Sequence, residues 1–502
     1  MLSDLRGWTP PLTPCYRLEE ARAELTRLRE KEKVIVKQLL DVRAEISLQN
    51  NKISSMRRPA INLLSDETLV SIFDLAIHDN SGYTSLGNRK QWLAGVSQKW
   101  RDLILNSPAL WSTIVVTEQD SIFTETCLKR SREVLLDIVV TSLSPSLEVV
   151  LSCTHRWRSL LLIENTGGES SFGDNFVKKT RNLDFPSLRR AIIPSLETGK
   201  SYPKFLFSMR APVLEHLQIG KHFAWNDFCP ATTLRTLELT FVKSRNYGQS
   251  FSYLIPNQTL TRLSLSGFID NWALRSDSIH FPHLKTLSLH IGKIHKFLKA
   301  IVAPNLESFV YSSLSSKHRP LDSFGGLDSK FGNVRYLQFL NITFETIDDT
   351  ADAEALFRAF PHVRYVELDT NCVLKLFTPR WQCGKFRTDL WSDLESLTLH
   401  GPRVSWRDDL QLLWSWLAVR RSLHSRLAHV KVTSIEEDYP DYTLPRYFYR
   451  LYCTTKDVCT LELDVLPIAF KAKISVCHDP SPTLVSQIMY LTFCDTHYYP
   501  IL

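Results

Sequence analysis

A leucine-rich phrase that recurs along most of the chain constrains its fold more than any other feature. The phrase reads Leu-x-x-Leu-x-Leu, and its leading apolar residues follow one another at intervals of 20 to 33 residues. The leading residues are Trp157, Leu188, Leu214, Leu234, Leu260, Leu284, Leu306, Val334, Val363, Leu394 and Leu427. In a strand, alternate side chains point to opposite faces, so each Leu-x-Leu buries its leucines and exposes the residue between them.

One such unit cannot cover its own apolar face, so neighbouring units have to stack. The pattern therefore predicts an α/β fold with a curved parallel sheet over residues 113–441. Beyond 441 the phrase fades, and we expect 442–502 to form a C-terminal capping region. The phrase resembles the leucine-rich repeat, in an irregular form that lacks the asparagine usual after the last leucine. We therefore expect a solenoid in which the backbone hydrogen bonds at the bends are satisfied in some other way.

Residues 16–57 are predicted to form one long helix, because helix formers dominate there and neither Pro nor Gly occurs. Ten of twelve a and d positions of a heptad repeat are apolar. These positions are Leu18, Ala21, Leu25, Leu28, Glu32, Ile35, Leu39, Val42, Ile46, Gln49, Ile53 and Met56. The helix either folds onto its own chain or forms a coiled coil with a second copy or another helix. In a parallel pair Glu24 and Arg29 attract, whereas the other flanking pairs contribute little.

Residues 58–112 are predicted to form a small helical module. Ser65 can cap a helix that carries Leu69, Ile72 and Phe73, and a second helix carries Val96 and Trp100. About fifty residues bury too little surface for an independent domain, so we expect a partner to cover the remaining apolar side chains.

The module resembles the F-box, in the form found in fungal F-box proteins with a preceding heptad helix. The resemblance rests on residues 61–73, 96–101 and 106–111. Matching positions are Leu64, Glu67, Leu69, Ile72, Phe73, Val96 and Trp100, whereas Ser65 and Ser97 replace the proline and cysteine usual in the family.

The resemblance implies a substrate-recognition subunit of a Skp-cullin-F-box ubiquitin ligase, which itself performs no catalysis. The F-box would dock onto the Skp adaptor, and through it a cullin, while the repeats bind a target protein. The implied adaptor contacts are Leu64, Leu69, Ile72, Phe73, Val96 and Trp100. Several of these side chains can instead form the core of the module itself. A non-catalytic scaffold that acts outside a ligase is the alternative function.

The residue before each Leu-x-Leu should line one column on the exposed face of the sheet. In two neighbouring copies that residue is a tyrosine, Tyr336 and Tyr365, with Arg335 and Arg364 preceding them. Aromatic residues near arginine are typical of binding hot spots. We therefore expect the two rings side by side in a target-binding site, unless a loop or the C-terminal cap covers them.

Composition excludes several other classes of protein. The net charge of +7 comes from 60 bases and 53 acids that are mixed along the chain, so nucleic acid is not an expected partner. Apolar runs are too short to span a membrane and no secretory signal is evident, so a cytoplasmic or nuclear location is expected.

No cofactor is expected, because the chain carries no glycine-rich phosphate loop, Gly-x-Ser-x-Gly elbow or His-Glu-x-x-His helix. One group of thiols and imidazoles near the C-terminus is a candidate metal site. Its members are Cys453, Cys459, Cys477, His478, Cys494 and His497. Their spacing does not match a zinc motif, so buried thiols and surface histidines are the expected explanation.

Overall fold

The computed structural model divides the chain into two compact units, which we describe separately. The first comprises Met1–Ser81 and Asn88–Ile104, and the second comprises Gly82–Gly87 and Leu105–Leu502. The structure describes residues 14–56, 61, 64–78, 86–118, 121–163, 172–194, 204–220, 232–241, 255–267, 275–292, 294–313, 324–340, 350–369, 391–400, 416–417, 420, 429–436, 460–466 and 472–475.

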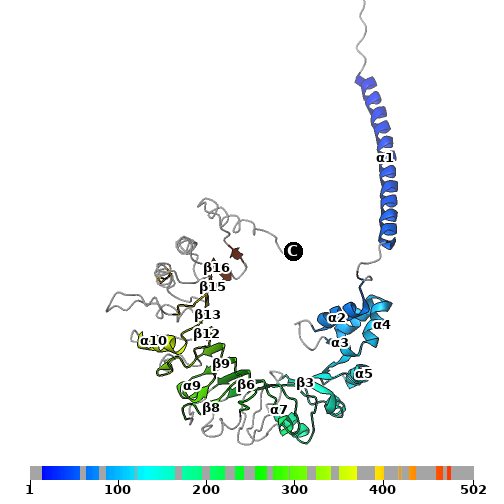
Figure 1. Ribbon diagram of the computed structural model, residues 1–502. Coiled ribbons are helices and arrows are strands. Elements are labelled where there is room, and N and C mark those ends of the chain that lie inside the picture. Colours follow the sequence, from blue (N-terminus) through cyan, green and yellow to red (C-terminus); the bar gives the residue numbers. More distant parts are fainter. Residues whose placement is uncertain are drawn as a thin grey trace, which may run out of the picture. The chain divides into compact units, whose positions relative to one another are not determined.

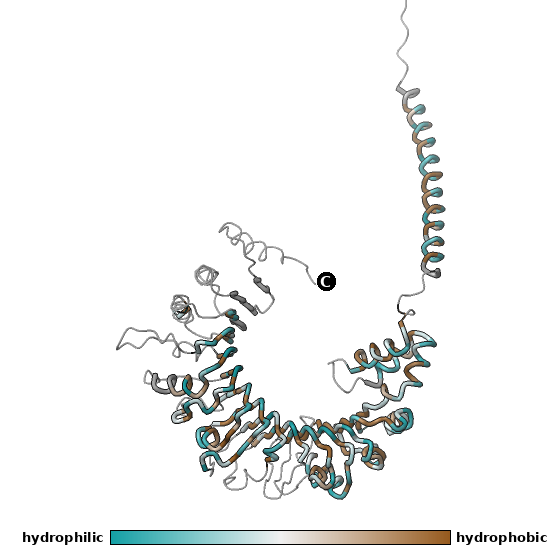
Figure 2. Tube along the Cα trace, in the orientation of Figure 1, coloured by the Kyte–Doolittle hydropathy of each residue, from teal (hydrophilic) through white to brown (hydrophobic). Residues whose placement is uncertain are grey.

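The first unit begins with the long helix α1, Pro14–Met56, close to the bounds expected from the sequence. At 1.5 Å per residue its 43 residues extend over about 65 Å. Every described side chain from 18 to 53 is exposed, and hydrophobic and hydrophilic residues alternate along the helix (Figure 2).

Three short helices complete this unit: α2, Asp66–Ile77, α3, Leu86–Val96, and α4, Gln98–Asn106. As predicted, Ser65 caps α2, its hydroxyl accepting a hydrogen bond from the Thr68 amide at 3.3 Å. The sequence predicted one helix through Val96 and Trp100, but the structure breaks it at Ser97. The Ser97 hydroxyl accepts from the Trp100 amide at 3.2 Å and starts α4, an N-cap contact that periodicity alone does not reveal.

The second unit contains a large sheet of parallel strands accompanied by short helices (Figure 1). In spatial order its strands are β1, Thr113–Val116, β2, Leu136–Val140, β3, Trp157–Leu162, β4, Arg190–Ile193, β5, His216–Ile219, β6, Thr236–Phe241, β7, Arg262–Gly267, β9, Thr286–Ile291, β11, Ser308–Ser312, β12, Tyr336–Leu340, β13, Tyr365–Asp369, β14, Ser396–His400, β15, His429–Glu436, β16, Thr460–Leu466, and β17, Ala472–Ser475. Neighbours pair in parallel, except that β17 runs antiparallel to β16. A separate parallel pair joins β8, Ile279–His280, to β10, Ile301–Val302.

The described part of the sheet extends past both ends of the leucine phrase. Strands β1 and β2 precede its first copy, and β16 pairs in parallel with β15 although it lies beyond residue 441. The boundary expected between the repeats and a cap at 442 therefore does not coincide with the end of the parallel pairing.

Burial alternates along the strands as the Leu-x-Leu pattern predicts. In β6, Leu237 and Leu239 are buried while Thr236 and Glu238 on the other face are half-exposed. The helices α5, Ser121–Ser131, α7, Phe172–Thr180, α9, His295–Ala300, and α10, Thr350–Ala359, lie on one side of the sheet (Figure 1). The other face carries mostly polar side chains, which we call the open face.

One arrangement of backbone hydrogen bonds recurs where the strands of the large sheet from β4 to β13 begin. The carbonyl of the residue before a strand accepts hydrogen bonds from two backbone amides at the start of the next strand. The Arg335 carbonyl, for example, accepts from the Arg364 amide at 2.8 Å and from the Tyr365 amide at 2.9 Å. The same arrangement occurs at Arg189, Glu215, Arg235, Thr261, Lys285, Glu307 and Arg364. Main-chain hydrogen bonds thus hold consecutive strands in register.

Side chains add hydrogen bonds between successive copies of the phrase, at the turns that precede the strands. Asn305 Nδ2 donates to the Pro282 carbonyl, and Asn333 Nδ2 donates to the Pro304 carbonyl, both at 2.6 Å. Thr233 Oγ1 donates to the Pro212 carbonyl at 3.0 Å. Each donor residue comes directly before the leading apolar residue of its copy of the phrase. Its acceptor lies in the preceding copy.

Candidate interaction surfaces

The core of the helical module is formed by one face of α2. Leu69, Phe73 and Ile77 are fully buried, and the Phe73 ring contacts Trp100 with 4.7 Å between ring centroids. Lys99 Nζ lies 3.0 Å from Asp66 Oδ1, which ties the start of α4 to the start of α2. Arg89 Nη1 donates to the Ile77 carbonyl at 2.9 Å and ties α3 to the end of α2.

Burial separates the six implied adaptor contacts into core residues and accessible residues. Leu69 and Phe73 have no exposed surface and lie four residues apart on one face of α2, so they belong to the core of the module. Ile72 and Val96 keep 39% and 61% of their surface exposed, while Leu64 and Trp100 are half-buried. Of the six residues, Ile72 and Val96 are therefore the most accessible to a partner.

Two exposed apolar side chains were missing from the sequence prediction. Leu75 on α2 is 74% exposed and Trp92 on α3 is 70% exposed. Leu75 lies three residues after Ile72, and Trp92 lies four residues before Val96, so each pair shares one helix face. The helical spacing from Ile72 could have identified Leu75 as a second exposed residue of α2. Nothing in the sequence shows which face of α3 is left uncovered. We call Ile72, Leu75, Trp92 and Val96 the exposed apolar set.

The second candidate surface lies on the open face over β12 and β13. Tyr336 and Tyr365 are direct register partners in these strands, as the alternation predicts. Tyr365 is 44% exposed and Tyr336 is half-buried. The two tyrosines thus occupy adjacent positions on neighbouring strands of the open face.

Carboxylates of the next strand orient both phenols. The Tyr365 hydroxyl donates to Glu395 Oε2 at 3.0 Å, and the Tyr336 hydroxyl donates to the Glu367 carboxylate. Burial and the Glu367 carboxylate raise the pKa of Tyr336, and the hydrogen bond to Glu395 raises the pKa of Tyr365. Both tyrosines are therefore neutral hydrogen-bond donors near neutral pH.

Glu367 joins three strands of the open face. Its Oε2 accepts from Gln338 Nε2 at 2.7 Å on β12 and lies 3.5 Å from His400 Nε2 on β14. The hydrogen bond from His400, followed by those from Tyr336 and Gln338, lowers the pKa of Glu367 despite its partial burial. The charged Glu367 carboxylate thus holds three side chains in place, those of Tyr336, Gln338 and His400.

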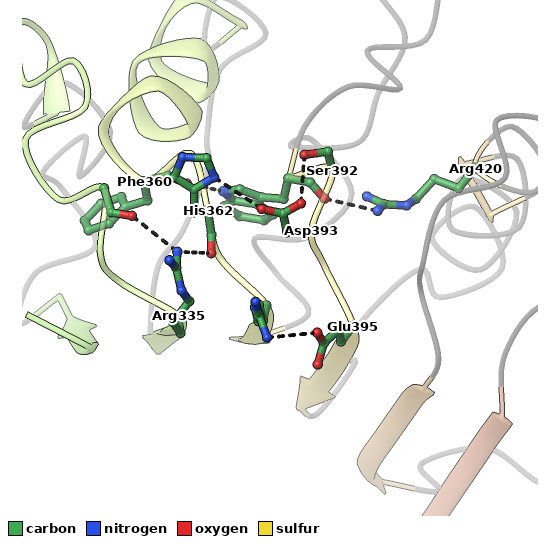
Figure 3. A network of polar contacts seen from close by, with 10 residues as sticks. Arg335, Phe360, His362, Ser392, Asp393, Glu395 and Arg420 are labelled. Carbon is green, nitrogen blue, oxygen red and sulfur yellow. Dashed lines mark hydrogen bonds and ion pairs between the residues drawn. The ribbon is translucent and has the colours of Figure 1, made fainter.

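A polar network also lines the starts of β12, β13 and β14 (Figure 3). Arg335 Nη1 donates to the His362 carbonyl at 2.8 Å, and His362 Nδ1 lies 3.2 Å from Asp393 Oδ2. The hydrogen bond from His362 lowers the pKa of Asp393. Arg364 Nη1 lies 3.4 Å from Glu395 Oε1, so the acceptor of Tyr365 is itself paired with an arginine.

Buried side chains hold together the segments that precede β13 and β14. Trp391 Nε1 donates to the Phe360 carbonyl at 3.0 Å, and Arg420 Nη2 donates to the Trp391 carbonyl at 3.0 Å (Figure 3). Phe309, Phe331 and Phe360 pack within about 6 Å of one another, between ring centroids, under the same strands. The tyrosine pair therefore stands on a rigid part of the sheet.

Metal and membrane features were searched in the part of the chain that the structure describes. No group of three or more His, Cys, Asp or Glu side chains that could hold a metal ion occurs there. The cysteine and histidine group from Cys453 to His497 lies outside the described residues. None of the described helices is long and apolar enough to cross a membrane.

Comparisons with known proteins do not place the chain in a family. No family model matches the sequence. No curated protein matches it either.

Proposed function

We propose that this chain is the substrate-recognition subunit of a Skp-cullin-F-box ubiquitin ligase. Residues 58–112 act as the F-box that binds the Skp adaptor, and the sheet of the second unit binds the target protein. The chain contributes binding and no catalysis. The proposal rests first on the resemblance of residues 61–73 and 96–101 to the F-box.

The observation that carries the proposal is the exposed apolar set of the module. Trp92 and Leu75 each keep 70% or more of their surface exposed in a module of three short helices. Exposing such side chains is unfavourable by roughly 25 cal/mol for each Å² of apolar surface, so a protein partner that covers them gains that free energy. Tryptophan is also the residue that most often dominates a binding interface.

We also propose that the second unit is an irregular leucine-rich-repeat solenoid. Its support is the combination of the recurring phrase, the parallel pairing and the arrangement of backbone hydrogen bonds that repeats from Arg189 to Arg364. In such an architecture each unit contacts mainly its neighbours, and the open face presents one column of side chains to a partner. The tyrosine pair of β12 and β13 occupies that column.

Affinity purification of the tagged full-length chain tests the function. We expect both the Skp adaptor and a cullin to co-purify, and Val96→Asp to remove both by placing a charge in the adaptor contact. Ile122→Asp is the matched control, because Ile122 on α5 is 80% exposed and lies in the other unit. Recovery of the adaptor without a cullin would favour the scaffold function, and recovery of neither would contradict the proposal.

A further inference from the structure

The long helix α1 carries most of the exposed large hydrophobic side chains of the described residues, and it lies outside the proposed adaptor and target contacts. Its leucines, isoleucines and valines keep between 48% and 69% of their surface exposed. Most of them, all but Val34, Leu40 and Leu48, lie at or beside the a and d positions of a heptad repeat over nearly the whole helix, which makes a stripe for one helical partner.

Charges beside the stripe distinguish the possible arrangements of two copies. In a parallel pair each a position faces the same residue of the other copy, so Glu32 would face Glu32 of the second copy inside the seam. Glu24 with Arg29 is the only attractive flanking pair between Leu18 and Met56 in that arrangement. The parallel arrangement therefore buries two like charges in the seam, and the charge pairs at its e and g positions add little attraction.

An antiparallel pair in full overlap removes this conflict. Leu18 then faces Met56 of the second copy, Leu28 faces Ile46, and Glu32 faces Val42. The two Glu32 carboxylates are ten residues apart along the seam, which corresponds to about 15 Å at 1.5 Å per residue. Repulsion at that distance between exposed charges is largely screened by salt.

The flanking charges also become complementary in this register. In an antiparallel coiled coil g positions face g positions, which brings Lys31 beside Glu45 and Glu24 beside Lys52 of the second copy. Each of these two attractive pairs occurs twice by symmetry. At the e positions, Arg29 beside Arg43 is the one repulsive pair, and it also occurs twice. Among the described residues, neither Lys31 nor Glu45 takes part in an ion pair within the chain.

Apolar contacts at the centre support the same register. Val36 at an e position is 48% exposed and faces Val36 of the second copy at the two-fold axis, next to the Ile35 and Leu39 layer. In the parallel pair Val36 would instead face Lys31. We propose that α1 binds α1 of a second copy as an antiparallel coiled coil, in the register that places Lys31 against Glu45.

Zero-length cross-linking of the full-length wild-type chain tests this register. A carbodiimide joins an amine to a carboxylate only where the two are in contact. Lys31 and Glu45 are about 21 Å apart within one helix, and Glu24 and Lys52 about 42 Å, so neither link can form within one α1 helix. We expect both links in a mixture of ¹⁵N-labelled and unlabelled chains, in peptides that combine one labelled and one unlabelled partner.

Charge reversal gives an independent measurement by sedimentation equilibrium. Lys31→Glu should raise the dimer dissociation constant about tenfold, because two attractive pairs become repulsive, and adding Glu45→Lys should restore it. Lys37→Glu is the matched control, since it makes the same charge change at an f position away from the seam. Polar replacement of Leu25 and Leu39 should yield a monomer.

Three results would overturn the proposal. A wild-type chain that remains monomeric at tens of micromolar would mean that α1 binds a different helix or its own chain. A dimer without mixed-isotope links between Lys31 and Glu45 would exclude this register. A dimer whose dissociation constant is unchanged by Lys31→Glu would leave the parallel arrangement as the explanation. Adaptor binding is measured separately, so its failure does not affect this result.

Discussion

Tyr336 and Tyr365 lie directly opposite each other on neighbouring parallel strands, and each donates its hydroxyl to a carboxylate one strand further along. Glu367 accepts from the first and Glu395 from the second. The two rings are therefore fixed in orientation while part of their surface remains exposed. This arrangement presents a rigid aromatic pair at low entropic cost to a partner.

The first prediction concerns capture of the target. Tyr365→Ala should reduce the amount of target protein recovered with the full-length chain about tenfold or more, because exposed rigid aromatics commonly dominate interfaces. Tyr365→Phe keeps the ring and loses only the bond to Glu395, so it should retain most of the binding. Quantitative mass spectrometry of co-purified proteins provides the readout.

Arg262→Ala is the matched control, since Arg262 belongs to the same column of the open face on β7. It should leave the recovered proteins unchanged. If Tyr336→Ala and Tyr365→Ala both recover the same proteins as the wild type, the tyrosine pair is not the target site.

A second prediction separates the core of the module from its exposed surface. Phe73→Ala should destabilise the module by about 3–5 kcal/mol, because the ring is fully buried against Trp100. Ile72→Ala, one residue earlier but on the exposed side, should cost less than about 1 kcal/mol. Amide hydrogen exchange in α2 and α4 measures both effects. Equal protection in the two variants would contradict the assignment of Phe73 to the core.

The alternation of leucines predicted the open face, the register and the tyrosine pair, because the strand period of two fixes the face of every residue. The helical module was less predictable. A helix pattern usually marks one apolar stripe, yet α2 carries two. Leu69 and Phe73 form the buried stripe, and Ile72 and Leu75 form the exposed one. The break at Ser97 also escaped prediction, because it depends on one hydroxyl contact and not on Pro or Gly. The carboxylates that orient the tyrosines come from other strands and carry no local signal.

The third prediction concerns pH. The pKa of Glu367 is lowered in the folded chain, so its ionised form stabilises the fold. That contribution is complete above the ordinary value of 4.5 and is lost as the pH falls through the lower folded pKa. Glu367→Gln should therefore weaken protection of β13 amides at neutral pH, and the difference from wild type should shrink below pH 4.5.

His400→Gln provides a second test of the same contact, because His400 is the largest cause of the lowered pKa. This variant should show a smaller loss of protection on acidification than the wild type does. An identical pH profile in wild type and both variants would show that Glu367 does not stabilise the strands.

The fourth prediction concerns the close approach of two strands at Gly267. Its φ is +104°, and a Cβ there would lie 1.8 Å from the Phe241 carbonyl oxygen. Gly267→Ala should lower the free energy of unfolding by about 1–3 kcal/mol through backbone strain, and the clash with the Phe241 carbonyl should lower it further. Gly95→Ala is the control, because it meets no atom within 4 Å on α3 and should stabilise that helix by about 0.5–1 kcal/mol. Thermal unfolding compares the two, and a melting temperature unchanged by Gly267→Ala would contradict this reasoning.

Direct titration of the purified full-length chain with the purified Skp adaptor, followed by calorimetry, tests the proposed function most directly. We predict saturable binding to the wild type, weakened at least about a hundredfold by Trp92→Asp and unchanged by Ile122→Asp, because burying an unpaired charge in the contact costs several kcal/mol. Hydrogen exchange confirms that α2 and α4 stay folded in each variant. Absence of binding to a folded wild-type chain, or equal affinity of wild type and Trp92→Asp, would contradict the proposed docking.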